Sequence, residues 1–479
     1  MKRRWLGVLS LLTAFALVVA ACGDDDDTSD TTAATTATTA APATTAAPAT
    51  TAAPATTAAP ATTAAPDEPE EVAFDVGVTP APCGDAVNDG NGCIYLGVIS
   101  DLTDGPFAAL AVPLTSAQED FWAGINSDGG LDGWDVIISG DNTFDSHYSG
   151  DLTVQGYESM RDRVALMAQT LGTPQLQAAL PRMVDDNVVT APATWWSGWA
   201  FAGIDSGNVL ESGAPYCLEA MNGMSFAVDQ MGNEFSWALV AFPGDYGGDY
   251  ASGALIAAAQ LGLPDPVANI LQIPMSAGGD AAGTIAELAA AAPNLIVIVS
   301  GPTEMATIVG GLFQAGHTEF RVLGAAPTWN VALLGNEALL PLLQAVFWNT
   351  SSIGGWATET DGHATMRAAA ETNGRDPNGA YIMGWVWQYP ILALLTQVIA
   401  TGDLTRANIA AIARTLDDVD YQGILPTRTY QGSATDHVER STVVSSVDPT
   451  SPDGLLGLTD SFVGQVAADF DLAAPCFVG

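Results

Sequence analysis

The sequence is poor in positive charge. Lysine occurs only at position 2, and 13 lysine and arginine residues stand against 54 aspartate and glutamate residues, for a formal net charge of -41 at pH 7. Nucleic acids and anionic lipid surfaces bind proteins through basic patches. We therefore expect neither nucleic acid nor an anionic lipid surface as a partner, and a solvated acidic surface adapted to salt explains the charge most simply.

Residues that catalyse hydrolysis are also scarce. The chain has neither a G-x-S-x-G nor an H-E-x-x-H motif, and its glycine-rich turns lack the lysine of a phosphate-binding loop. An extracellular hydrolase, the main alternative class, would need a nucleophile with a base, paired carboxylates or a metal. We expect no enzyme activity, no metal and no cofactor. The four scattered histidines are His147, His317, His363 and His437.

A long apolar run occurs only near the start of the chain. Three basic residues precede a run that ends at Ala21, which is short for a membrane span and has the layout of an export signal. Val19-Ala20-Ala21-Cys22 resembles the bacterial lipobox, whose cysteine receives diacylglycerol. The resemblance implies that 1–21 is a lipoprotein signal peptide and that Cys22 is lipidated. An uncleaved anchor helix is the alternative.

The next segment has too few large apolar side chains to form a core. Four aspartates lead into a Thr/Ala/Pro repeat with a period of six residues. Regular proline removes backbone donors and favours extended, semi-rigid conformations. The composition predicts an acidic and Thr/Ala/Pro-rich disordered stalk over 22–75.

Cysteine is rare, and its use is typical of an oxidising compartment. Four cysteines follow Cys22, and an even number in an exported protein suggests two disulfides, with three possible pairings. We favour Cys83–Cys93, which closes a short local loop, and Cys217–Cys476, which ties the tail to the middle of the chain. A zinc site is the alternative, but no cysteine pair has the required spacing with a nearby histidine.

From about residue 72 the sequence alternates between strand and helix patterns. Apolar runs such as CIYLGVIS (93–100) and NLIVIVS (294–300) predict buried strands, and 114–130 places apolar residues at helical spacing. Such alternation predicts parallel sheets with right-handed crossovers. It occurs twice, which indicates two α/β units in tandem.

The order of these motifs resembles that of periplasmic binding proteins of the branched-chain amino-acid type. YLGVISDLTDGPF, a helix ending in Gly-Gly, ALVAFPGDYGGDY and NLIVIVSGPTEMATIVGG follow one another as in that family, over about 93–438. The resemblance implies an α/β fold of two doubly wound Rossmann-like lobes, joined by three crossovers, that close on a ligand. The implied segments are 76–212 in lobe 1, 213–345 in lobe 2, 346–440 mainly in lobe 1, and 441–479 returning to lobe 2.

Ligands of open α/β sheets bind at the carboxyl ends of the strands. Gly172 and Thr173 stand at such an end, just before a helix, where backbone N–H groups and a hydroxyl suit an electronegative group. A plain helix cap is the alternative role for Thr173. The resemblance adds Ala193 and Thr194 after the next strand, and Tyr246 of the second lobe.

Two departures from the family bear on specificity. Where amino-acid binders place an acid for the ligand ammonium group, this chain has Ala325-Ala326-Pro327, and Leu110 stands where a cleft-facing tyrosine is expected. A buried, unpaired cation is costly. The ligand is therefore an amine only if another acid compensates, and an amide, a carboxylate without an amine or an apolar ring are the alternatives. The candidate acids are Asp101, Asp104, Asp245 and Glu304.

Tryptophans follow one of the predicted cleft strands. Trp195, Trp196 and Trp199 are placed to stack on a ligand or to bind a cation, or else to pack between the lobes. Trp385 falls where a helix of the family approaches the cleft, and the same two roles are open to it. We include Trp195 and Trp385 among the candidate ligand contacts.

Together these features predict an extracytoplasmic, lipid-anchored solute-binding protein. We expect a monomer that delivers a small polar or amphipathic molecule (amino-acid-like, an amide or a small carboxylate) to an ABC permease. Its partners would be the small-molecule ligand, the permease and the membrane that holds the lipid on Cys22. A surface sensor that presents a ligand through the same fold is the alternative, and the sequence does not separate it from transport.

Overall fold

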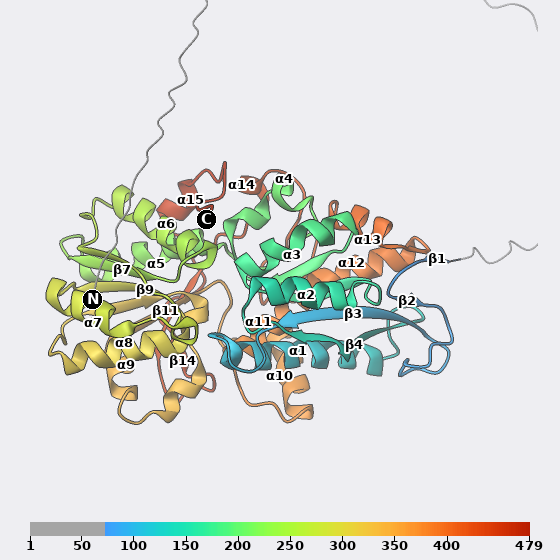
Figure 1. The fold of residues 1–479 in the computed structure, drawn as a ribbon, viewed down its shortest axis with the longest axis horizontal. Helices are drawn as coiled ribbons and strands as arrows, with labels where there is room; N and C mark the ends of the chain where they lie inside the picture. Colours follow the sequence, from blue (N-terminus) through green and yellow to red (C-terminus); the bar gives the residue numbers. More distant parts are fainter. Residues whose placement is uncertain (1–71) are drawn as a thin grey trace, which may run out of the picture. The chain divides into compact units, whose positions relative to one another are not determined.

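Two large β-sheets covered by helices, and a separate pair of short strands, make up the part of the chain that the structure describes. The structure is a computed structural model and describes residues 72–479 (Figure 1). The predicted signal peptide, the predicted lipidation site Cys22 and most of the predicted stalk lie outside these residues. The stalk prediction ran to residue 75, but β1 (Ala73–Phe74) already pairs in parallel with β12 (Asp403–Leu404). The folded part therefore begins earlier than predicted.

The first sheet is built around two strands, β3 (Gly92–Ser100) and β5 (Leu166–Leu171), that are buried on both faces along almost their whole length. Its other strands are β2 (Val78–Thr79), β4 (Trp134–Asp145) and β6 (Thr190–Ala193). Strand β3 pairs in parallel with β4 and β5, β5 pairs in parallel with β6, and β2 runs antiparallel to the start of β3. Leu96 and Val98 of β3 enter one hydrophobic cluster and Ile99 enters another, because side chains alternate along a strand. Burial on both faces explains the nearly continuous apolar runs.

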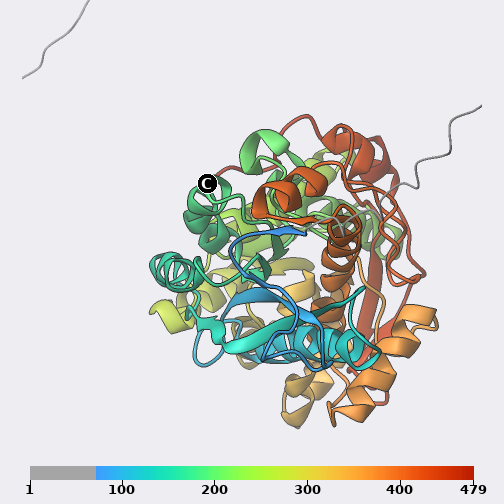
Figure 2. The same ribbon diagram turned by 90° about the vertical axis from the view of Figure 1, so that its right-hand side faces the viewer.

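The helices around the first sheet come from two separate parts of the chain. They are α1 (Ala108–Ser127), α2 (Gly150–Met160), α3 (Thr173–Asp185), α4 (Ala202–Asp205), α10 (Asp361–Thr372), α11 (Gly379–Val386), α12 (Gln388–Ala400), α13 (Arg406–Ala413) and α14 (Ala434–His437), with the 3-10 turn η1 (Ser197–Ala200). On one face, Tyr157 of α2 and Leu176 of α3 pack with Ile99. Elsewhere α11 packs along α1 and α12 contacts β6, and Figure 2 shows the orange late helices beside the blue first sheet.

The second sheet has seven strands. They are β7 (Trp237–Ala241), β8 (Ala268–Leu271), β9 (Leu295–Val299), β10 (Arg321–Gly324), β11 (Phe347–Ser351), β13 (Val443–Val447) and β14 (Leu455–Gly457). Their order is β14-β13-β11-β10-β9-β7-β8, and the five strands from β11 to β8 are parallel. Strands β13 and β14 extend this sheet in antiparallel fashion.

Helices cover both faces of the second sheet as well (Figure 1). They are α5 (Tyr216–Met231), α6 (Asp245–Gln260), α7 (Ala281–Ala291), α8 (Pro302–Gln314), α9 (Leu340–Val346) and α15 (Gln465–Asp469), with 3-10 turns η2 (Met275–Ala277), η3 (Ala326–Thr328) and η4 (Val331–Gly335). Strand β9 shows how they are held: Val297 packs into the cluster that contains Tyr250 of α6, whereas Ile296 and Ile298 pack with Ile308 of α8. Alternate side chains of a buried strand thus pack against the helices on opposite faces of the sheet.

The path of the chain between the sheets matches the predicted fold class. The chain leaves the first sheet after β6, returns to it for α10 to α14, and ends in the second sheet, so three segments cross between the lobes. Strand β11 begins at Phe347, beyond the predicted segment boundary at residue 345, and belongs to the second sheet. Its side chains alternate between buried faces, but it directly follows α9, and the sequence pattern alone does not separate the two elements.

One segment of the described residues is long and apolar enough to cross a membrane by length and composition. Gly379–Ala400 has a mean hydropathy of 1.3, yet 67% of it is buried inside the protein. It is broken at Trp387 into α11 and α12, which pack against α1 and the first sheet. This segment is core structure of the first lobe.

Both disulfide pairings that the cysteine spacing favoured are confirmed. Cys83 and Cys93 join with their Cα atoms 5.8 Å apart, and Cys217 and Cys476 with theirs 6.4 Å apart. The second disulfide fixes a tail that touches both lobes, since the indole nitrogen of Trp196 donates a hydrogen bond to the carbonyl oxygen of Phe477 at 2.8 Å.

Removing the long-range disulfide should destabilise the protein. The Cys217–Cys476 bond closes a loop of 259 residues, and cross-links of long loops restrict the unfolded chain most, so Cys476→Ser should lower the free energy of unfolding by about 2–4 kcal/mol. Urea denaturation monitored by tryptophan fluorescence measures this loss. The double variant Cys217→Ser/Cys476→Ser should lose no more than the single variant, and a clearly larger loss in the double variant would contradict the account.

Candidate ligand-binding site

One cavity lies between the two lobes, at the carboxyl ends of β5 and β6. Its walls surround about 460 Å³ of space between atoms, part of which is open to solvent. Residues of both lobes line it, from α1, α3 and the α11–α12 junction on one side and from α5, α6 and η3 on the other. The lining residues are Phe107, Leu110, Leu114, Tyr148, Leu171, Gly172, Thr173, Ala193, Thr194, Trp195, Tyr216, Tyr246, Pro327, Met383 and Trp387.

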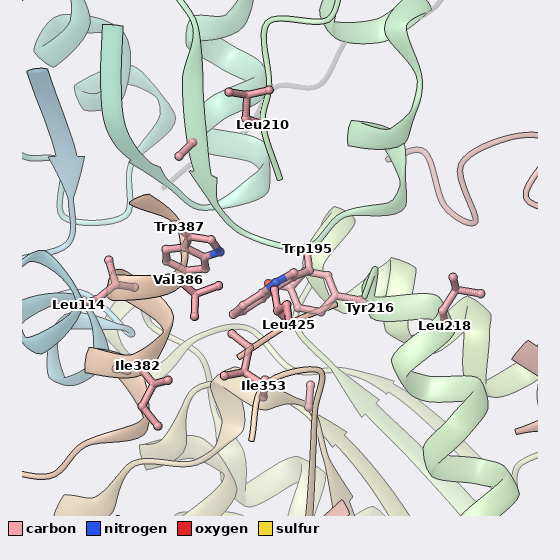
Figure 3. Packing of buried hydrophobic residues seen from close by; sticks show 14 of the residues in the cluster. Leu114, Trp195, Leu210, Tyr216, Leu218, Ile353, Ile382, Val386, Trp387 and Leu425 are labelled. Carbon is pink, nitrogen blue, oxygen red and sulfur yellow. The ribbon is translucent and has the colours of Figure 1, made fainter. Parts of the chain in front are cut away.

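The structure brings seven of the eight candidate ligand contacts together around this cavity. The eighth, Trp385, packs in the core of the first lobe, with its ring 4.9 Å from that of Phe121 and its indole nitrogen donating to the hydroxyl of Tyr389 at 3.2 Å. Trp387 faces the cavity in its place (Figure 3). Trp385 and Trp387 are two residues apart and therefore point to nearly opposite sides of the helix, and the apolar pattern of this segment does not reveal which side faces the cavity. The seven are Leu110, Gly172, Thr173, Ala193, Thr194, Trp195 and Tyr246.

One end of the cavity carries hydrogen-bonding groups. Thr173 begins α3, and its backbone N–H is the first of those that have no acceptor within the helix. The hydroxyls of Thr173 and Thr194 are hydrogen-bonded to each other, so one of the two hydroxyl protons remains to be donated elsewhere. The helix N-terminus adds partial positive charge, and this end therefore suits an anionic or other electronegative group.

Gly172 makes this arrangement of strand end and helix start possible. Its φ of +91° is in the left-handed region, and a Cβ atom there would lie 2.1 Å from Oε1 of Gln175 and 2.7 Å from the ring of Tyr148. Any other residue would push Gln175 and Tyr148 away. Gly172 therefore contributes through its backbone and lets the helix start approach the ring of Tyr148.

Aromatic rings form most of the remaining wall. The ring centroids of Phe107 and Tyr148 lie 4.9 Å apart, those of Tyr216 and Tyr246 4.9 Å apart, and those of Trp195 and Trp387 5.1 Å apart. Figure 3 shows Trp195, Tyr216 and Trp387 converging from three different elements. Such a wall offers a large apolar surface with few polar atoms.

The tyrosines of the wall remain neutral. Burial raises the pKa of Tyr148, Tyr216 and Tyr246 above that of an ordinary phenol. The hydroxyl of Tyr246 donates to the carbonyl oxygen of Ser300 at 3.2 Å. At physiological pH these groups therefore supply polarity without charge.

The sequence did not indicate several of these lining residues. Phe107 and Tyr148 come from loops, and Tyr216 begins α5 directly after the first crossing between lobes. Tyr148 has a φ of +57°, which is uncommon for a residue other than glycine. Such positions are set by loop conformation, and the only available signal was their nearness to strand ends.

Trp196 and Trp199 do not line the cavity. Their rings pack against each other with centroids 4.8 Å apart, in the hydrophobic cluster of α2 and α3. Of the three tryptophans that follow β6, Trp195 alone reaches the cavity, where its indole nitrogen donates to the carbonyl oxygen of Ser212 at 2.5 Å.

No charged side chain lines the cavity among the residues that the structure describes. All four candidate acids have other roles: Asp101 accepts from the N–H groups of Gly105 and Phe107, and Asp104 bonds Nδ1 of His147 at 2.6 Å. Asp245 accepts from the N–H of Gly479 and Glu304 from that of Met275. The compensating acid considered from the sequence is therefore not present at the cavity.

The loop that stands where the family has its acid is hydrogen-bonded to another carboxyl group, which does not line the cavity. The backbone N–H of Ala326 donates to Oε1 of Glu219 at 2.9 Å, and the hydroxyl of Thr350 donates to the same oxygen at 2.6 Å. Glu219 is buried in α5, and burial raises its pKa to about 8. It supports the loop after β10 and does not line the cavity.

Comparison with known proteins places this fold and cavity in a family. The model of the family described as "Periplasmic binding protein" matches residues 94–451. A fatty acid ABC transporter substrate-binding protein from Thermomonospora curvata has a similar structure, with a TM-score of 0.72 at 23% identity over 81% of this chain and 97% of that one. A search of curated protein sequences finds no match.

Two further structures share the fold at lower identity. A branched-chain amino acid ABC transporter protein from Thermus thermophilus with bound valine gives a TM-score of 0.65 at 17% identity, over 79% of this chain and 98% of that one. A solute-binding protein from R. palustris in complex with 4-hydroxybenzoate gives 0.63 at 12% identity, over 78% and 98%. Because the family model covers most of the described residues, the chain belongs to the periplasmic binding protein family and has its two-lobed type I fold.

Proposed function

We propose that this protein binds a small carboxylate with an apolar body and delivers it to an ABC importer. The observation that carries the proposal is a cavity that combines an anion-binding end, at Thr173 and Thr194, with an aromatic wall and no acidic side chain among its lining residues. An α-ammonium group would be buried there without a partner, which is costly. A carboxylate without an amine satisfies both features.

The names of related structures support this choice of ligand class. One is a fatty acid ABC transporter protein and another holds 4-hydroxybenzoate, and both are carboxylates without an α-amine. A third holds valine, an α-amino acid. The charge-free lining of this cavity favours the first two classes.

Delivery would follow closure of the lobes around the ligand. The cavity is lined from both lobes, and the lobes are joined by three crossing segments, so hinge motion of these segments would open and close it. We propose that Cys22 carries the lipid that keeps the monomeric protein at the outer face of the membrane. Mass spectrometry of the N-terminal peptide should find acyl chains on Cys22, and an unmodified cysteine in membrane-associated protein would contradict lipidation.

A thermal-shift panel tests the proposed ligand class. A ligand that binds only the native state raises the melting temperature, by an amount that grows with its concentration relative to Kd. Aliphatic and aromatic carboxylates should raise it, whereas amides, α-amino acids and sugars at the same concentration should not. A shift with α-amino acids alone, or turnover of an ester or glycoside by the protein, would overturn the proposal.

Removing the hydroxyl of Thr173 should weaken binding. Thr173→Val keeps the shape of the side chain but takes a donor from the carboxylate, and a hydrogen bond to a charged group contributes about 1.5–3 kcal/mol, or ten- to a hundredfold in Kd. Isothermal titration measures the change. Thr170→Val is the matched control, because Thr170 is buried in the same strand–helix unit but does not line the cavity. Equal affinity of Thr173→Val and the wild type would remove Thr173 from the site.

A further inference from the structure

A second cavity adjoins the first one. It encloses about 520 Å³ of empty space, and Leu110 and Met383 line both cavities. These two flexible apolar side chains therefore form the boundary between them. A ligand whose apolar body passes Leu110 and Met383 would reach from the hydroxyl end of the first cavity into the second.

The second cavity differs from the first in its polar lining. Asn349 of β11 lines it and is only 3% exposed. Its Nδ2 donates to the carbonyl oxygen of Thr350 at 3.2 Å, whereas its Oδ1 has no partner among the residues that the structure describes. A buried acceptor without a partner costs about 1–3 kcal/mol, and such a group needs an explanation.

Several other polar side chains at this cavity already make hydrogen bonds within the protein. Both carboxyl oxygens of Asp453 accept hydrogen bonds, from the N–H of Trp356 at 2.8 Å and from the hydroxyl of Ser451 at 3.2 Å. Asn378 caps α11 by accepting from the N–H of Ala380 at 2.9 Å. The Oδ1 of Asn349 is thus the buried acceptor at this cavity that has no partner among the described residues, and as a neutral amide oxygen it can accept from a neutral hydroxyl or amide donor.

We propose that the second cavity is a subsite of the same ligand-binding site, in which Asn349 accepts a hydrogen bond from a neutral donor at the far end of the ligand. The ligand is then a carboxylate with an apolar middle and a terminal hydroxyl or amide. This inference rests on the proposed function, which requires the carboxylate end. It adds a specificity-determining residue and a second polar group on the ligand.

Matched ligand pairs test the subsite. The probes are hexanoate, octanoate, decanoate and dodecanoate, each with its ω-hydroxy derivative, titrated calorimetrically into the wild-type protein. At the chain length that spans both cavities, the hydroxyl should tighten binding by about tenfold. Asn349→Leu removes the acceptor and should bring the ratio of the two affinities, ω-hydroxy against plain carboxylate, to about one, whatever its effect on the plain carboxylate. Asn349→Asp keeps an acceptor and should keep the advantage.

The outcomes separate the two proposals. If plain carboxylates bind but the hydroxyl adds nothing at any chain length, an ordinary buried water satisfies Asn349 and the subsite is wrong, while the proposed function stands. If the advantage persists in Asn349→Leu, the donor is bound elsewhere and the assignment to Asn349 fails. If neither series binds, the proposed function fails and the subsite with it. If Asn349→Leu does not fold, the comparison of plain and ω-hydroxy carboxylates on the wild-type protein still tests whether the second cavity binds a donor.

Discussion

Pro327→Glu should lower the affinity for apolar carboxylates by about a hundredfold and give α-amino acids a binding site. Pro327 lines the cavity directly after β10, where the family resemblance places an acid. Two unit charges about 5.5 Å apart interact by about 3 kcal/mol at an effective dielectric constant of 20, which is about a hundredfold in Kd. The new carboxylate repels the carboxylate of the ligand and attracts an ammonium group.

Titration calorimetry with 4-methylpentanoate and leucine measures both changes, because these molecules differ only in the amine. Pro327→Gln is the matched control, since it adds a side chain of the same size without charge and should not invert the preference. If Pro327→Glu binds 4-methylpentanoate as tightly as the wild type, the cavity is not where the ligand binds. A loss with both Glu and Gln would show that the added volume, and not the charge, is responsible.

Glu219→Gln should remove a large pH dependence of stability. Glu219 is 1% exposed, and burial raises its pKa to about 8 from the ordinary value of 4.5. A carboxyl group whose pKa is raised by folding contributes stability that is fully present below its unfolded pKa. That contribution is lost as the pH rises through the folded pKa. Between about pH 4.5 and pH 8 the wild type should therefore lose on the order of a few kcal/mol through this group.

Urea denaturation at pH 5 and pH 9 measures the effect. Glutamine retains the oxygen that accepts from Ala326 and Thr350 but does not ionise, so Glu219→Gln should gain stability relative to the wild type at pH 9 and little at pH 5. Glu371→Gln, at an exposed position on α10, is the matched control and should follow the wild type at both pH values. Parallel pH dependence of Glu219→Gln and the wild type would contradict the account of a buried, ionising Glu219.

The alternation of strand and helix patterns was sufficient to predict two α/β units, and the family resemblance added the three crossings between them. Strands such as β3 and β9 are buried on both faces, and their apolar runs are therefore visible in the sequence. The end of β5 is equally visible, because Gly172 breaks the run and Thr173 starts a helix. These local signals led to the polar end of the cavity, which depends on strand ends and a helix start.

The aromatic wall was predicted less well, for reasons that lie in loop and junction geometry. Trp385 and Trp387 belong to one apolar segment and point to nearly opposite sides of it, so the rotation of the helix within the fold decides which of them faces the cavity. Tyr148 reaches the cavity through a left-handed backbone conformation, and Tyr216 through the crossing before α5. None of these geometries has a distinct pattern in the sequence.

The absence of the family acid was visible in the sequence, but its consequence was not. Asp101 and Asp245 lie in loops near strand ends, as a compensating acid would, yet both bind backbone N–H groups outside the cavity. A carboxylate that the sequence places near a cleft frequently accepts hydrogen bonds from the backbone N–H groups of its own loop instead, because those groups need acceptors. Whether a charged side chain lines the cavity could therefore be decided only from the three-dimensional structure.

The proposed function requires a cavity that accepts a carboxylate and rejects an ammonium group. The most direct measurement is calorimetric titration of the ligand-free wild-type protein with two matched pairs, 4-methylpentanoate against leucine and 3-phenylpropanoate against phenylalanine. We predict that in at least one pair the carboxylate binds about a hundredfold more tightly than the amino acid. Equal or tighter binding of the amino acid in both pairs would contradict the account.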